Sequence, residues 1–139
     1  ELLERVYLLS VDRFEVPIEQ KIKYYEALVE MSKYEQADAF YSENFSNISD
    51  LTKPEISIVG SLRAYSLFNL NKRQEGLEEI KRAEAADSTV AVVYYYKGKI
   101  LFENSDLVQA RVALDRSIEL DLDGSVSSRA QEFIEVNNI

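Results

Sequence analysis

Apolar residues recur every three or four positions along most of the chain, which is the spacing of one face of an α-helix. Two clear stripes are Ile56, Val59, Leu67, Leu70 and Leu107, Ala110, Leu114, Ile118. No alternating pattern of the kind that indicates β-strands competes with this spacing. The pattern predicts eight helices, over residues 1–13, 18–31, 33–46, 53–70, 72–86, 89–103, 106–120 and 125–136.

Several predicted helices are preceded by a capping signal. In a capping box, a short polar side chain stands three residues before Glu or Gln and accepts a hydrogen bond from the first helical turn. Thr52 and Glu55 have this spacing, and so do the pairs that begin at Ser32, Asn71 and Asp106. We therefore predict that these four side chains cap the helices that follow them. The short connections predict that neighbouring helices are antiparallel hairpins.

The hairpins repeat at an interval of 34 residues. An ungapped alignment of residues 57–90 with residues 91–124 pairs small, apolar and acidic positions: Ala64 with Gly98, Gly76 with Ala110, Ile80 with Leu114, and Asp87 with Asp121. This pattern resembles the tetratricopeptide repeat family, in which small residues stand where the two helices of a 34-residue unit cross. The resemblance implies an all-α fold, a right-handed superhelical solenoid of antiparallel helix hairpins.

The resemblance organises residues 1–139 as a single domain. Residues 91–124 match the repeat best and residues 57–90 match it next best, while residues 18–51 form a weaker repeat, with Tyr25 at a position where a small residue is expected. Five extra residues, 52–56, interrupt the period. Residues 1–17 are interpreted as a partial repeat with an N-terminal helix, and residues 125–139 as a C-terminal capping helix. The alternative is a helical bundle without repeats.

In this family the first helix of each unit lines a concave groove. Carried over to this sequence, the resemblance implies a partner-binding groove formed by Ile22, Glu26, Ile58, Tyr65, Phe68, Tyr95, Lys99 and Phe102. Members that bind a terminal carboxylate use Lys, Asn and Arg at set positions, which here are occupied by Ile22, Glu26, Leu62, Val92 and Tyr96. No carboxylate clamp is therefore expected.

The predicted groove is aromatic and apolar with acidic borders. Aromatic side chains supply most of the binding energy at protein interfaces, and opposite charges at the rim orient the partner. We therefore expect a non-catalytic interaction module or scaffold for a protein or peptide that is apolar or amphipathic with basic residues. The alternative is a structural segment of a larger repeat array or a homo-oligomer, whose groove is filled by its own or a neighbouring helix.

Composition excludes other classes of function. The chain has 25 Asp and Glu against 16 Lys and Arg, a net charge of −9, and neither His nor Cys. Histidine bases, thiolate nucleophiles and Cys/His zinc sites are thus absent, and we expect no enzyme activity, cofactor or metal. The acidic balance argues against nucleic acid. No apolar run reaches the roughly 20 residues that span a bilayer, so no direct membrane insertion is expected.

The absence of cysteine fits the cytoplasm, although a periplasmic location is the alternative if a targeting segment was removed. Two local motifs also lead to predictions. Tyr94, Tyr95 and Tyr96 diverge around a helix, so one should lie in the core, one in the groove and one between units. The segment that runs from Asp121 to Gly124 is predicted to be a helix-terminating turn and not a calcium loop.

Overall fold

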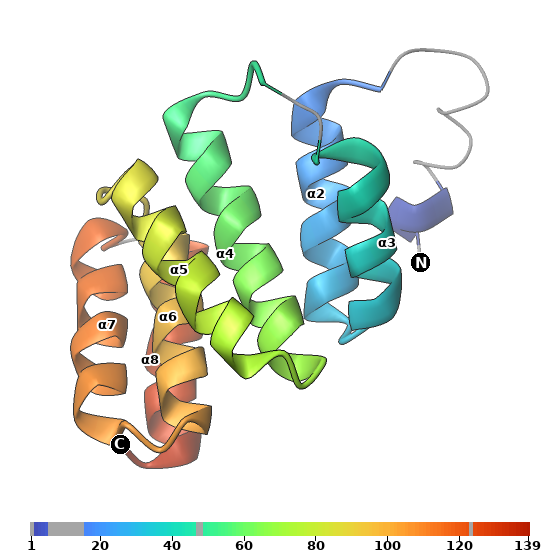
Figure 1. The fold of residues 1–139 in the computed structure, drawn as a ribbon. Coiled ribbons are helices and arrows are strands. Elements are labelled where there is room, and N and C mark those ends of the chain that lie inside the picture. The colour runs from blue at the N-terminus through green and yellow to red at the C-terminus, as the bar shows by residue number, and fades with distance from the viewer. Residues whose placement is uncertain (1, 6–15, 47–48, 123) are drawn as a thin grey trace. The chain divides into compact units, whose positions relative to one another are not determined.

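The computed structural model describes residues 2–5, 16–46, 49–122 and 124–139, and within these ranges the regular structure is helical (Figure 1). The helices are α2 (Ile18–Glu30), α3 (Tyr34–Asn44), α4 (Lys53–Asn69), α5 (Arg73–Ala86), α6 (Ala91–Glu103), α7 (Leu107–Leu120) and α8 (Ser125–Asn137). The all-α prediction is confirmed, and the predicted ends of these helices are correct to within two residues. Residues 2–5 of the predicted first helix are helical, and the rest of that helix lies outside the described residues.

The predicted single domain consists of two compact units, Glu1–Ser49 and Asp50–Ile139. The boundary falls just before residues 52–56, the five residues that interrupt the 34-residue period. The first unit contains α2 and α3, and the second contains α4 to α8.

Aromatic side chains hold the hairpin of α2 and α3 together. Tyr25 is fully buried, and its ring centroid lies 6.1 Å from that of Phe40 and 5.3 Å from that of Phe45. Tyr24 also packs on Phe40, with the centroids 4.9 Å apart. Stacked and tilted aromatic pairs at such distances stabilise a core beyond their buried area. The bulky Tyr25 that departs from the repeat pattern is therefore the centre of this unit's core.

Small residues instead bring the helices of the next two hairpins close together. A Cβ atom on Gly76 of α5 would lie 2.8 Å from the carbonyl oxygen of Ala64 on α4. In the hairpin of α6 and α7, a Cβ atom on Gly98 would lie 3.2 Å from the carbonyl oxygen of Ala110. These four residues are the pairs that the 34-residue alignment matched. Both hairpins thus cross where a glycine faces a small residue of the partner helix.

The three hairpin turns share one backbone geometry. Ser32, Asn71 and Ser105 have positive φ angles of 59°, 65° and 65°. In each turn the next N–H donates to a carbonyl five residues earlier, at 2.9 Å, in the pairs Lys33–Leu28, Lys72–Leu67 and Asp106–Leu101. This is the Schellman arrangement, in which a left-handed residue ends a helix and satisfies its last carbonyl groups.

This geometry corrects two of the four capping predictions. Ser32 and Asn71 end the preceding helices in the left-handed conformation, and the N-cap positions of α3 and α5 are Lys33 and Lys72, without a side-chain capping bond. The other two predictions are confirmed. The capping box of Thr52 and Glu55 opens α4, and Asp106 Oδ1 accepts a 3.2 Å hydrogen bond from the N–H of Gln109 at the start of α7.

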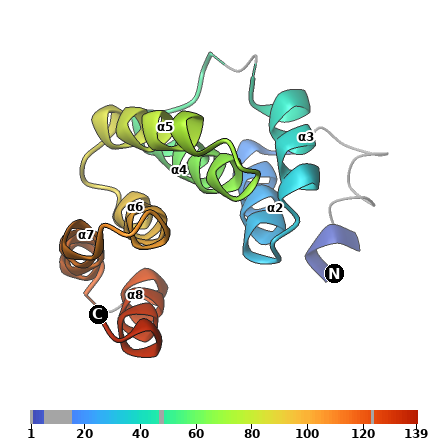
Figure 2. The same ribbon diagram turned by 60° about the horizontal axis from the view of Figure 1, so that its bottom comes forward.

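The last helix, α8, is capped from a distance. Asp121 Oδ2 accepts hydrogen bonds from the N–H of Val126 at 3.0 Å and of Ser127 at 3.3 Å. Asp121 thus satisfies donors of the first turn of α8, as expected of a turn between helices, whereas Asp123 lies outside the described residues. Within the second unit, α6 contacts both α4 and α8, and Figure 2 shows it between them.

Candidate functional site

Three side chains at 34-residue intervals form a row across α4, α6 and α8. They are Tyr65, Lys99 and Phe133, which we call the aromatic row. The ammonium nitrogen of Lys99 lies 4.5 Å from the ring centroid of Tyr65 and 5.9 Å from that of Phe133. The period in the sequence therefore corresponds to neighbours in space on three alternate helices, α4, α6 and α8.

Two cations converge on the ring of Tyr95. Lys99 Nζ lies 5.2 Å from its centroid and Arg129 Cζ lies 4.9 Å from it. Lys99 is also 5.8 Å from the ring of Tyr96, which is fully buried. Each such contact is worth about 0.5–1 kcal/mol at a partly exposed site. The half-buried lysine thus ties α4, α6 and α8 together through aromatic rings.

Beyond Lys99 the row continues into an apolar patch. Phe102 meets Phe133 edge to face, with the ring centroids 5.4 Å apart, and both side chains are partly exposed. Val136, three residues after Phe133 on the same side of α8, is 75% exposed. We call the partly exposed set Lys99, Phe102, Arg129, Phe133 and Val136 the row surface. The row surface therefore has apolar side chains at one end and two cations beside them.

Only some of the predicted groove residues lie close together in the structure. Tyr65, Tyr95 and Lys99 come together and Phe102 joins them through Phe133, but Tyr65 and Tyr95 are only 7% and 6% exposed. These two tyrosines therefore support the row surface from below.

The other predicted residues lie elsewhere. Phe68 differs from the prediction: it is buried, and its ring lies 5.0 Å from Arg73 Cζ, because it fills the crossing of α4 and α5 beside Gly76. Ile58 is half-buried on α4, and Ile22 and Glu26 are half-buried on α2 in the other unit. The prediction omitted Arg129 and Phe133, although one further 34-residue step from Lys99 leads to Phe133.

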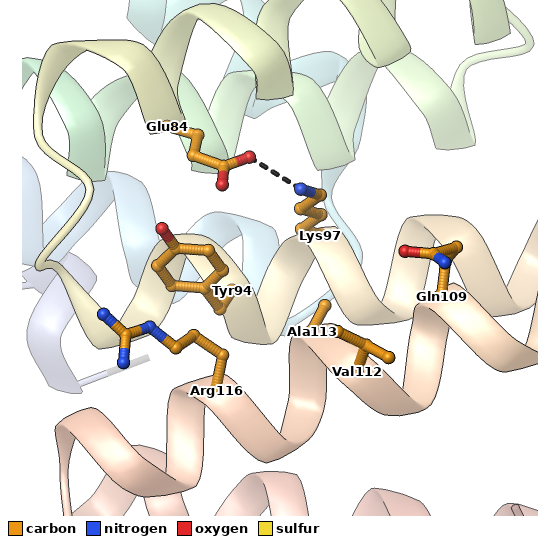
Figure 3. A pocket seen from close by; sticks show the side chains of 7 residues that line it. All are labelled: Glu84, Tyr94, Lys97, Gln109, Val112, Ala113 and Arg116. Atoms are coloured by element: carbon orange, nitrogen blue, oxygen red, sulfur yellow. Dashed lines mark hydrogen bonds and ion pairs between the residues drawn. The ribbon is translucent and has the colours of Figure 1, made fainter.

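A second candidate site is a pocket of about 260 Å³ between α5, α6 and α7 (Figure 3). It is lined by Glu84, Tyr94, Lys97, Gln109, Val112, Ala113 and Arg116. Glu84 accepts a 2.6 Å hydrogen bond from Lys97, and this ion pair joins α5 to α6. The hydroxyl of Tyr94 donates to the carbonyl oxygen of Ser88 at 2.9 Å. Burial, reinforced by the carboxylate of Glu84, raises the pKa of Tyr94 above its ordinary value.

The rim of this pocket combines a cation with an apolar side chain. Arg116 Cζ lies 5.9 Å from the ring of Tyr94, and its NH1 lies 3.3 Å from a carboxylate oxygen of Glu119. The side chain of Arg116 is 46% exposed and Val112 is 56% exposed. Sequence reasoning missed this pocket because three helices contribute to it and none carries a motif for it.

The three neighbouring tyrosines face different surroundings: Tyr94 lines this pocket, Tyr95 contacts Lys99 and Arg129, and Tyr96 is fully buried. All three are buried, so none of them is the exposed groove residue that the prediction included.

Neither surface contains metal-binding chemistry. Within the described part of the chain, His, Cys, Asp and Glu side chains form no group of three that could hold a metal ion. In the same ranges, no helix has the length and apolar character needed to cross a membrane. No protein-family model matches the chain, and no curated protein or solved structure is significantly similar to it.

Proposed function

We propose that the protein is a non-catalytic interaction module, built from tetratricopeptide-like helix hairpins, that binds a peptide or helix of a partner protein at the row surface. The observation that carries this proposal is the aromatic row, since Tyr65, Lys99 and Phe133 are 34 residues apart in sequence and in contact around one ammonium group. The glycine crossings and the two turns at Asn71 and Ser105 follow the same interval, which supports a repeat architecture.

The row surface suits a partner with apolar anchors. Phe102, Phe133 and Val136 offer partly exposed apolar area, and a few anchors of this kind dominate the energy of most interfaces. Lys99 holds the supporting rings in place, so the receptor loses little conformational entropy on binding.

A peptide selection tests this function. A display library of about 16-residue peptides, a length suited to helix or extended recognition, is selected against the full chain. Binders are then measured against Phe102→Asp and Val136→Asp. The matched control is Leu122→Asp in the turn before α8, because Leu122 is 71% exposed and Val136 is 75% exposed.

We expect most binders to lose about tenfold or more in affinity with Phe102→Asp and Val136→Asp and to keep it with Leu122→Asp. Circular dichroism confirms that each variant retains its helices. A selection whose binders are indifferent to both changes on the row surface would refute the proposal.

A further inference from the structure

The outer face of α7 carries an exposed stripe that is unlike the matching face of α5. Val108 and Val112 are 73% and 56% exposed, and the side chain of Arg116 is 46% exposed. Residues four apart lie on one side of a helix, so these three form one line. The residues 34 positions earlier on α5 are polar: Gln74, Glu78 and Arg82. Repeat packing therefore does not require the two exposed valines of α7.

The pocket lies beside this stripe. Val112 and Arg116 stand at its rim, and the buried Tyr94 and Ala113 add apolar lining (Figure 3). Its volume of about 260 Å³ is below the roughly 300–1,000 Å³ of sites for drug-sized molecules. The pocket is therefore of a size to take one large side chain.

The charges at the pocket favour an anionic neighbour. Lys97 is held by Glu84 at 2.6 Å, and Arg116 adds a second positive charge to a lining with one carboxylate. A guanidinium group has five N–H donors in a planar fork, of which the contact with Glu119 engages NH1. The rest of the fork matches a carboxylate in charge and geometry.

We propose that the stripe and the pocket form a second docking site, separate from the row surface, for an acidic amphipathic helix of a partner protein. A large apolar side chain of that helix enters the pocket against Tyr94 and Val112, and a second one covers Val108. A carboxylate one turn away accepts hydrogen bonds from Arg116. The two apolar contacts supply the affinity, and the carboxylate sets the direction of the partner helix along the stripe.

The test uses a display library of about 16-residue helical peptides, selected against the full chain. Binding is measured for Val112→Asp, Arg116→Ala and Arg116→Lys, with Arg82→Ala as the matched control because Arg82 is the residue one repeat earlier. Circular dichroism checks the fold of each variant. Val136→Asp identifies peptides that bind the row surface instead.

We expect a class of peptides with an acidic residue one turn from a large apolar residue. This class should lose about tenfold in affinity with Val112→Asp and with Arg116→Ala, lose less with Arg116→Lys, and weaken as salt increases. It should be unchanged by Arg82→Ala and Val136→Asp. If no selected peptide depends on both Val112 and Arg116, or if Arg82→Ala weakens binding equally, the proposal is overturned. Binders that respond only to Val136→Asp overturn it while supporting the row surface.

Discussion

The close crossing of α4 and α5 makes Gly76→Ala a sharp test of the repeat architecture. The new methyl group would lie 2.8 Å from the carbonyl oxygen of Ala64, 3.1 Å from the backbone nitrogen of Phe68 and 3.2 Å from its Cβ atom. The first two contacts are with backbone atoms, which cannot move aside by changing a rotamer. The helices must therefore separate at the crossing.

Two opposing contributions set the size of the effect. Ala is favoured over Gly inside a helix by about 1 kcal/mol. Forcing an extra methyl group into a well-packed core costs about 1–3 kcal/mol, and a clash with backbone belongs to the upper part of that range. We expect Gly76→Ala to lower the free energy of unfolding by about 1–2 kcal/mol, which corresponds to a melting temperature roughly 5–15 °C lower for a unit of this size.

Gly60→Ala is the matched control on α4. Its methyl group would meet the side chain of Ala83 at 3.1 Å and the nearest backbone atom at 3.6 Å, so a shift of a few tenths of an ångström accommodates it. The helix preference of Ala then offsets the strain, and stability should change by less than about 0.5 kcal/mol. Urea unfolding followed by circular dichroism measures both variants. A Gly76→Ala variant as stable as Gly60→Ala would contradict a close crossing of α4 and α5.

Three further predictions concern single side chains. Lys99→Met keeps most of the aliphatic stem but removes the charge, so it should lower the free energy of unfolding in urea by about 1 kcal/mol. Lys99→Arg keeps the charge and should lower it less. Equal losses would argue against a cation–π contribution. Asp121→Ala removes the cap of α8, so it should lower the free energy of unfolding by about 1 kcal/mol and speed amide exchange at Val126. Unchanged exchange would contradict the capping role. The raised pKa of Tyr94 means that the folded state holds this proton after the unfolded state has released it. Stability should therefore fall as pH rises above about 10, the ordinary tyrosine value. Ultraviolet difference titration against Tyr94→Phe should show one tyrosine titrating above that value, and a normal titration would refute it.

The candidate site was predictable only in part. Tyr65, Tyr95, Lys99 and Phe102 were found because the 34-residue register assigns them to equivalent helix faces. Their exposure could not be predicted from this register. Neighbouring side chains bury Tyr65 and Tyr95, whereas Phe102 stays partly exposed. Phe133 could have been found by extending the period by one more step.

The sequence by itself determined the helices, their ends, and the interval that relates them. These features depend on local preferences and on side-chain periodicity, so they can be read from residues close together in the chain. Thr52 and Asp106 were recognised as caps for the same reason. Ser32 and Asn71 were misjudged because the conformation of a turn depends on how the preceding helix ends.

Only the tertiary structure decided which side chains meet and which remain at the surface. The pocket joins Glu84, Tyr94 and Arg116 from three helices, and the row surface joins Lys99 to Phe133 across two. Periodicity specifies the face of a helix on which a residue stands. The partner of that face, and the space left beside it, follow from helix packing, in which glycine crossings and large rings determine how closely the helices approach.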